Sequence, residues 1–202
     1  MDAYSLKKVT TFLEQDHIRK LIEQEDLETV YKEFEYESDI LTRYFLECSI
    51  YPDDYMTYIP ENCFTRGVAE GSYVVSGTVK SIGRWAFSAC PKLVEVVIPN
   101  SVTKIAEHAF HSCGLQSLTV PKSVTVIEES AFRFCHDLKS VTFNNNVLTV
   151  EEDAFSSCAK DSILVVNFSG TKQQFRSITK GAFKDTYYIA HCIDGDIVKR
   201  RK

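Results

Sequence analysis

The chain has 202 residues, of which 44% are apolar and 25% charged, and this composition is typical of a protein with a buried hydrophobic core. No apolar run is long enough for a membrane-spanning helix, and the N-terminus lacks the apolar segment of a signal peptide. These features exclude a membrane-embedded protein and indicate a soluble cytoplasmic protein that contacts no membrane, and the net charge is −5.

The charge is unevenly distributed along the chain. Residues 1–64 carry fifteen acidic and six basic side chains, whereas residues 65–202 carry thirteen acidic and seventeen basic ones. Apolar residues recur at helical spacing in residues 6–46, and this pattern predicts four short helices. We therefore expect residues 1–58 to form an acidic helical unit that differs from the rest of the chain.

The most acidic part of this unit is the segment 23–39, which contains eight carboxylates and one basic residue, Lys32. Such a segment repels the phosphates of a nucleic acid, so direct binding of DNA or RNA is not expected. Two interpretations stay open. The carboxylates form a solvated helix face, or Glu33, Glu35 and Glu37 dock against a partner protein with a basic surface.

A repeat begins near residue 59 and continues to residue 183. The motif A-F-x-x-C occurs at residues 86–90, 109–113, 131–135 and 154–158, and a diverged copy lies at residues 59–64. An aliphatic residue precedes each Ala-Phe pair by four positions, and a segment resembling L-x-x-V-x-I-P separates successive motifs. The repeat period is therefore 22 or 23 residues.

This period, together with a segment of the form L-x-x-L-x-L, predicts a leucine-rich repeat solenoid in which each turn adds one strand to a parallel sheet. We expect those strands at residues 93–99, 115–121 and 138–144. The predicted fold class is an α/β solenoid with a curved parallel β-sheet over residues 59–183. Residues 1–58 are expected to cap its open first coil, and residues 184–202 to form a C-terminal closure and a basic tail.

The pairing of I-x-x-x-A-F-x-x-C with L-x-x-V-x-I-P resembles the BspA-like leucine-rich repeat family over roughly residues 59–183. The resemblance implies a curved solenoid that binds proteins or surfaces and has no catalytic residues. Many members of that family are secreted or attached to the cell surface, whereas this sequence shows no export signal. Residues 168–175 and 190–196 also resemble the C-terminal closure of small family members.

The chain has seven cysteines, an odd number that suits a reducing compartment. Four of them belong to the motif and are Cys90, Cys113, Cys135 and Cys158. We expect these four to stack in a buried ladder, reduced and free of metal, because free cysteine behaves as a small buried hydrophobe. Zinc bound with His111 and His136 is the first alternative, and the sequence lacks the C-x-x-C pair typical of such a site. Disulfides between coils are the second, and the compartment argues against them.

The positions between the large apolar residues of each predicted strand face outward from the sheet. They form a small, mixed and nearly uncharged surface that offers hydrogen bonds and shape but no catalytic acid, base or nucleophile. We expect this surface to contact a protein partner. Its candidate residues are Val94, Glu95, Val97, Gln116, Ser117, Thr119, Lys139, Ser140 and Thr142.

Two aromatic residues interrupt the repeat. Trp85 stands in a column that otherwise holds Asn, His, Ser and Asp, and Phe134 stands in a column of Ala and Ser. Large aromatic side chains at such positions indicate a contact surface, because aromatic residues dominate binding hot spots. The alternative for Trp85 is packing beneath the helical cap.

Together these features predict a non-enzymatic intracellular module that binds another protein through the sheet face and the acidic helices, with no cofactor or metal. An alternative function is an acidic inhibitor, of the kind found in phages or mobile elements, that blocks a nucleic-acid-handling enzyme. A third is a surface adhesin.

Overall fold

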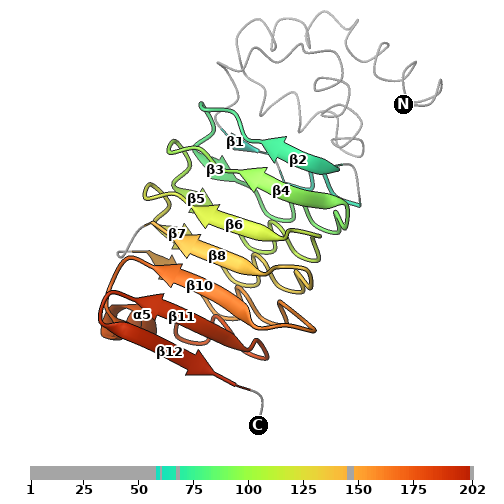
Figure 1. Cartoon of the computed structure of the whole chain (residues 1–202). Helices are drawn as coiled ribbons and strands as arrows, with labels where there is room; N and C mark the ends of the chain where they lie inside the picture. The colour runs from blue at the N-terminus through green and yellow to red at the C-terminus, as the bar shows by residue number, and fades with distance from the viewer. Residues whose placement is uncertain (1–57, 60, 67–68, 145–147, 201–202) are drawn as a thin grey trace, which may run out of the picture. The chain divides into compact units, whose positions relative to one another are not determined.

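A computed structural model describes residues 58–59, 61–66, 69–144 and 148–200. The chain divides into two units, residues 1–56 and residues 57–202, and all described residues belong to the second. They form a parallel β-solenoid of about six turns, visible in Figure 1 as a stack of coils. The predicted helical cap, with Glu33, Glu35 and Glu37, lies outside the described residues.

Five turns of the solenoid contain a two-residue strand that includes the aliphatic residue recurring in each repeat. These strands pair in parallel in the order β1-β3-β5-β7-β9, and in each of them the aliphatic residue is buried. They were not predicted, because two residues are too few to show a strand pattern. Their bounds are Tyr58–Ile59 (β1), Ser81–Ile82 (β3), Lys104–Ile105 (β5), Val126–Ile127 (β7) and Thr149–Val150 (β9).

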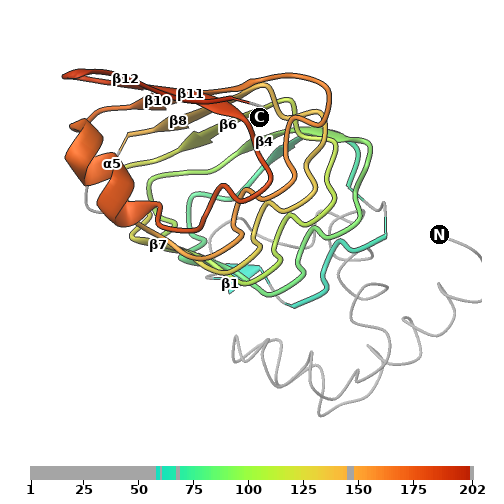
Figure 2. The same cartoon turned by 90° about the horizontal axis from the view of Figure 1, so that it is seen from below.

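A second, longer strand in each turn builds the opposite side of the coil (Figure 2). β2 and β4 form a two-stranded sheet. β6, β8, β10 and β11 pair in parallel in a second sheet, and β12 completes its five strands by pairing antiparallel with β11. β4, β6 and β8 confirm the three predicted strands, and β6 ends directly before Pro121, which has no backbone N–H to donate. The bounds are Gly71–Val74 (β2), Leu93–Val97 (β4), Ser117–Val120 (β6), Ser140–Phe143 (β8) and Leu164–Phe168 (β10).

The core is a column of stacked phenylalanine rings. Phe87 and Phe110 lie 4.8 Å apart with an interplanar angle of 3°, and Phe110 and Phe132 lie 5.1 Å apart at 2°. These distances match the spacing of neighbouring strands, because each coil adds one ring to the column. Phe155 and Phe183 continue the column into the last coil, and the Ala before each ring is fully buried.

The turn around each Ala-Phe pair has two residues in the left-handed backbone region. One column contains Asn62, Trp85, His108, Ser130 and Asp153, and the other contains Arg66, Ala89, Ser112, Phe134 and Ser157, all with φ between 55° and 63°. Residues other than glycine adopt this region at some energetic cost, which the neighbouring coils must offset. Backbone hydrogen bonds between coils do so, as where the N–H of Phe87 donates to the carbonyl of Ala109 at 2.7 Å.

The last coil closes differently from the others. Helix α5 (Lys172–Ile178) begins at Thr171, whose hydroxyl accepts the N–H of Gln174 in a capping box, and it buries Phe175. Strands β11 (Tyr188–Cys192) and β12 (Gly195–Lys199) then form an antiparallel hairpin. Among the described residues α5 is the only helix, so this part of the chain is a β-solenoid and not the predicted α/β one.

Candidate functional site

The outward residues of β2, β4, β6, β8 and β10, here called the sheet face, include most of the predicted contact residues. In β6 the side chains of Leu118 and Val120 are buried, whereas Ser117 and Thr119 are exposed. The parallel register places Ser117 opposite Ser140 and Thr119 opposite Thr142. The fold therefore aligns four hydroxyl groups in two rows that run across the strands.

The next strand extends both rows. Asn167 of β10 lies opposite Thr142 and donates a hydrogen bond from Nδ2 to the Thr142 hydroxyl at 3.3 Å, and Val165 lies opposite Ser140. Neither residue was predicted as part of the surface. The alternation of L-V-V-N-F over residues 164–168 repeats that of the earlier strands and could have identified both.

The sheet face becomes apolar toward β2. Val74 is 68% exposed and lies opposite Val97, which is 44% exposed, and Val94 is 39% exposed. Glu95 is exposed and lies opposite Ser72. Exposed valines on neighbouring strands form an apolar patch, and such patches are a common feature of interaction sites.

Gln116 and Lys139 lie just before β6 and β8, and both are exposed. The backbone N–H of Lys139 donates to the carbonyl of Gln116 at 2.8 Å, which continues the pairing of the strands. Glu95 and Lys139 are the two charged groups among the contact residues predicted on the sheet. The face therefore offers hydroxyls, amides and aliphatic surface, which suit recognition of another surface more than chemistry on a substrate.

Trp85 and Phe134 lie in turns rather than on the sheet face. The Trp85 indole stacks on the His108 ring at 3.9 Å with an interplanar angle of 17°, and both side chains are half-buried. His111 lies 5.5 Å from Trp85 and 5.3 Å from Phe134, and His136 lies 5.9 Å from Phe134. Histidines thus connect the two predicted aromatics into one aromatic strip across neighbouring coils.

Burial shifts the pKa values of two histidines in this strip. Removal from water lowers the pKa of His108, and Glu107, whose Oε1 lies 3.1 Å from His108 Nε2, opposes that effect. Burial also lowers the pKa of His111, and the neighbouring His108 adds to the effect. Burial therefore favours the neutral form of both imidazoles.

A hollow of about 350 Å³ adjoins the end of the strip. Phe134, His136 and Tyr187 contribute aromatic walls, and Lys160 and Asp185 contribute opposite charges. The guanidinium of the preceding residue, Arg133, lies 4.8 Å from the centre of the Phe134 ring in a cation–π arrangement. Phe134 is thus held by its own coil and also lines an open depression.

The motif cysteines are buried, as predicted, and each thiol also donates a hydrogen bond. Its acceptor is the carbonyl of the motif phenylalanine of the preceding coil. Burial raises the pKa of Cys113 and of Cys135 above the usual range of a thiol, which disfavours a nucleophilic thiolate. The bonds are Cys90 to Phe64 at 2.8 Å, Cys113 to Phe87 at 2.9 Å, Cys135 to Phe110 at 3.2 Å and Cys158 to Phe132 at 3.1 Å.

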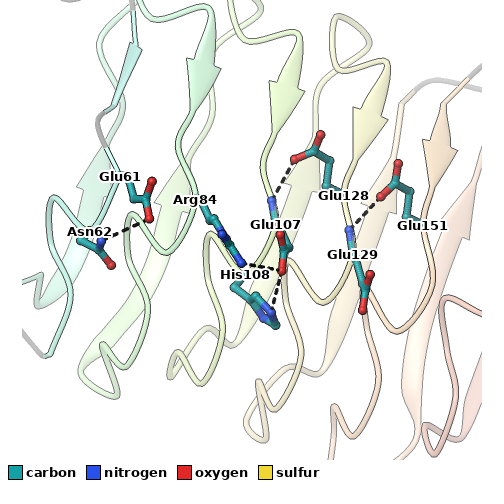
Figure 3. Close-up of polar contacts among 8 residues, drawn as sticks. All are labelled: Glu61, Asn62, Arg84, Glu107, His108, Glu128, Glu129 and Glu151. Carbon is teal, nitrogen blue, oxygen red and sulfur yellow. Dashed lines mark hydrogen bonds and ion pairs between the residues drawn. The ribbon is translucent and has the colours of Figure 1, made fainter. Parts of the chain in front are cut away.

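Carboxylates in the turns after the short strands tie neighbouring coils together (Figure 3). Glu128 accepts the backbone N–H of Glu107, and Glu151 accepts that of Glu129, both at 3.1 Å. Glu107 in turn forms an ion pair with Arg84 at 3.2 Å. These carboxylates have structural partners, so their clustering is explained by coil packing without a ligand.

In the described ranges, no group of three or more His, Cys, Asp and Glu side chains is arranged to hold a metal ion. Among the helices of the same ranges, none combines the length and the apolar character needed to cross a membrane.

Comparison with known proteins identifies the repeat. The family described as BspA type Leucine rich repeat region matches residues 57–190 in six copies, which confirms the resemblance found in the sequence. No curated protein matches the chain significantly.

Several solved bacterial structures are similar to the chain. A leucine rich cell surface protein from Faecalibacterium prausnitzii A2-165 is 25% identical with a TM-score of 0.52, over 63% of this chain and 36% of that one. The T. pallidum Leucine Rich Repeat protein is 24% identical with a TM-score of 0.49, over 65% and 61%. The pneumococcal vaccine antigen PcpA is 17% identical with a TM-score of 0.46, over 69% and 43%. The match therefore spans 61% of the T. pallidum chain and 36% of the Faecalibacterium chain.

Proposed function

The chain belongs to the BspA-type leucine-rich repeat family, and from this premise we propose that it is a non-catalytic module that holds a protein partner against its sheet face. Leucine-rich repeat proteins typically bind other proteins. The observation that carries the proposal is the alignment of two hydroxyl rows, in which exposed Ser117 and Thr119 lie opposite half-buried Ser140 and Thr142, beside the exposed valines of β2 and β4.

This face has the composition of a protein interface. Protein interfaces combine an apolar centre with direct hydrogen bonds at its margin. Here Val74 and Val97 supply apolar area, and Thr119, Thr142 and Asn167 supply donors and acceptors. All five lie on paired strands, so little backbone entropy is lost when a partner binds.

The acidic segment adds a second element to the proposal. Glu33, Glu35 and Glu37 would accelerate association with a basic partner, since clustered charge acts mainly on the association rate. The partner in this proposal is intracellular. If it is a nuclease or a polymerase, the module acts as an inhibitor that covers the enzyme's basic groove.

A role at the cell surface is the second candidate function. The observation that favours it is the likeness to the Faecalibacterium protein, which is described as a leucine rich cell surface protein. In that case the same sheet face would bind a component of a host or of the cell envelope.

The test compares two pairs of substitutions on opposite sides of the coil. Thr119→Arg with Thr142→Arg places bulky charged side chains on the sheet face, and Thr103→Arg with Thr125→Arg changes exposed threonines beside the short strands. Capture from native lysate identifies the bound proteins. The proposal is supported if the parent and the variant at Thr103 and Thr125 retain these proteins, whereas the variant at Thr119 and Thr142 releases them faster.

Capture that is equal for both variants would contradict the assignment of the sheet face. The identity of the captured proteins separates the candidates, because nucleases or polymerases indicate the inhibitor and envelope components indicate the surface role. In the same assay, reversal of Glu33, Glu35 and Glu37 to Lys should slow association and weaken its dependence on salt.

A further inference from the structure

Strand β12 forms one edge of the five-stranded sheet (Figure 1). It pairs with β11 on one side, and no strand in the described part of the chain pairs with its other side. An open edge has unpaired backbone donors and acceptors that another strand can satisfy. Val198, the fourth of its five residues, is 47% exposed on the outer face of the sheet.

The hairpin that carries this edge is held in place. Between β11 and β12, the Asp194 carboxylate accepts the backbone N–H of Lys172 in α5 at 2.8 Å, and the N–H of Ile193 donates to the Gly170 carbonyl at 3.0 Å. Lys199 donates from Nζ to the Phe183 carbonyl at 2.6 Å. An edge that is already ordered loses little conformational entropy when it pairs.

The sequence of the edge is complementary to itself. In β12 the side chains of Asp196 and Val198 lie on the outer face, because they are opposite His191 and Ile189 of β11. Arg200 is exposed and directly follows β12, and a strand extended by this one residue would place it on the same face. Two antiparallel copies related by a two-fold axis through Val198 would bring each Asp196 opposite the partner's Arg200. A two-fold axis through Ile197 would instead bring Asp196 opposite a valine and would form no ion pair.

We propose that two copies of this chain dimerise by antiparallel pairing of β12 with the partner's β12, centred on Val198 and joined by two Asp196–Arg200 ion pairs. The pairing joins two five-stranded sheets into one that is continuous across the axis. It is an isologous contact, since the same residues meet in both directions, and it therefore closes at two copies. The sheet face stays open on each copy.

The expected affinity is modest. A single five-residue strand on each side buries less area than the roughly 1,200 Å² of a standard stable interface. We therefore expect a monomer–dimer equilibrium with a Kd on the order of micromolar to a few hundred micromolar. Because two ion pairs contribute, the dimer should weaken as the salt concentration rises.

The test is sedimentation equilibrium of the full chain over a wide concentration range. Asp196→Arg alone and Arg200→Asp alone should each shift the equilibrium to monomer by at least about tenfold, because like charges then face each other twice. The double variant Asp196→Arg with Arg200→Asp should restore the dimer. The double variant also lacks the contact between Asp196 Oδ1 and His191 Nδ1 at 2.9 Å, so that contact cannot account for the restoration.

Lys122→Asp replaces a positive charge by a negative one, as Arg200→Asp does, but on an exposed turn residue, and it should leave the monomer–dimer equilibrium unchanged. Circular dichroism of each variant checks that the solenoid is intact. A parent chain that stays monomeric at all concentrations would overturn the proposal. So would a dimer that persists in both single variants, or one that the double variant fails to restore.

Discussion

Separate replacement of Cys113 by Ala and by Ser tests whether the buried cysteines are hydrogen-bond donors or only fill space. The Cys113 thiol donates to the carbonyl of Phe87 at 2.9 Å. In the last coil Thr186 takes the place of the cysteine, and its hydroxyl donates to the carbonyl of Phe155 at 2.6 Å. A hydroxyl can therefore replace the thiol as the hydrogen-bond donor in this column.

The expected loss of unfolding free energy follows from the burial of the acceptor carbonyl. Phe87 is fully buried, so its carbonyl cannot gain a water molecule when the donor is removed. A buried acceptor without a partner costs about 1 to 3 kcal/mol, and a weak thiol donor places the loss near 1 kcal/mol. The missing sulfur adds about 0.8 kcal/mol, as for one methylene. Cys113→Ala should thus lower the free energy of unfolding by about 2 kcal/mol, and Cys113→Ser by about 1 kcal/mol or less.

The assay is urea unfolding followed by far-ultraviolet circular dichroism at neutral pH. Cys192→Ala serves as the control, since Cys192 is half-buried and its thiol lies 4.0 Å from the Ala190 carbonyl. This control should change stability by less than about 0.5 kcal/mol. If the column only fills space, the apolar Ala is tolerated better than Ser, so a Ser variant less stable than the Ala variant would refute the donor role.

The remaining predictions concern the ring column and the histidines. Phe110→Ala should lower the free energy of unfolding by about 3 to 5 kcal/mol, because it removes a ring stacked between two others, and urea unfolding measures this loss. Stability should also fall as the pH drops below about 6.5, because the lowered pKa values of His108 and His111 mean that the unfolded chain binds more protons. His111→Gln should weaken this pH dependence in thermal melts, and an unchanged profile would exclude His111 as a source.

The period of A-F-x-x-C, together with the L-x-x-V-x-I-P segments between the motifs, was enough to predict the solenoid and three of its strands. A period of 22 or 23 residues places Phe87, Phe110 and Phe132 at equivalent positions of successive coils, and each ring is buried against the ring of the next coil. Strand alternation likewise separated buried Leu118 from exposed Thr119. Local pattern sufficed because each of these positions repeats in every turn.

Other features depended on contacts between coils that no single repeat contains. The columns of Trp85 and Phe134 contain small or polar residues in the other repeats, and their left-handed backbone in the turns cannot be seen from the sequence of one repeat. There the indole lies flat on His108, a residue 23 positions further along the chain. The same holds for the thiol of Cys113, whose acceptor lies 26 residues earlier. Residue types can be read along the chain, but which donor meets which carbonyl is decided only when one coil stacks on the next.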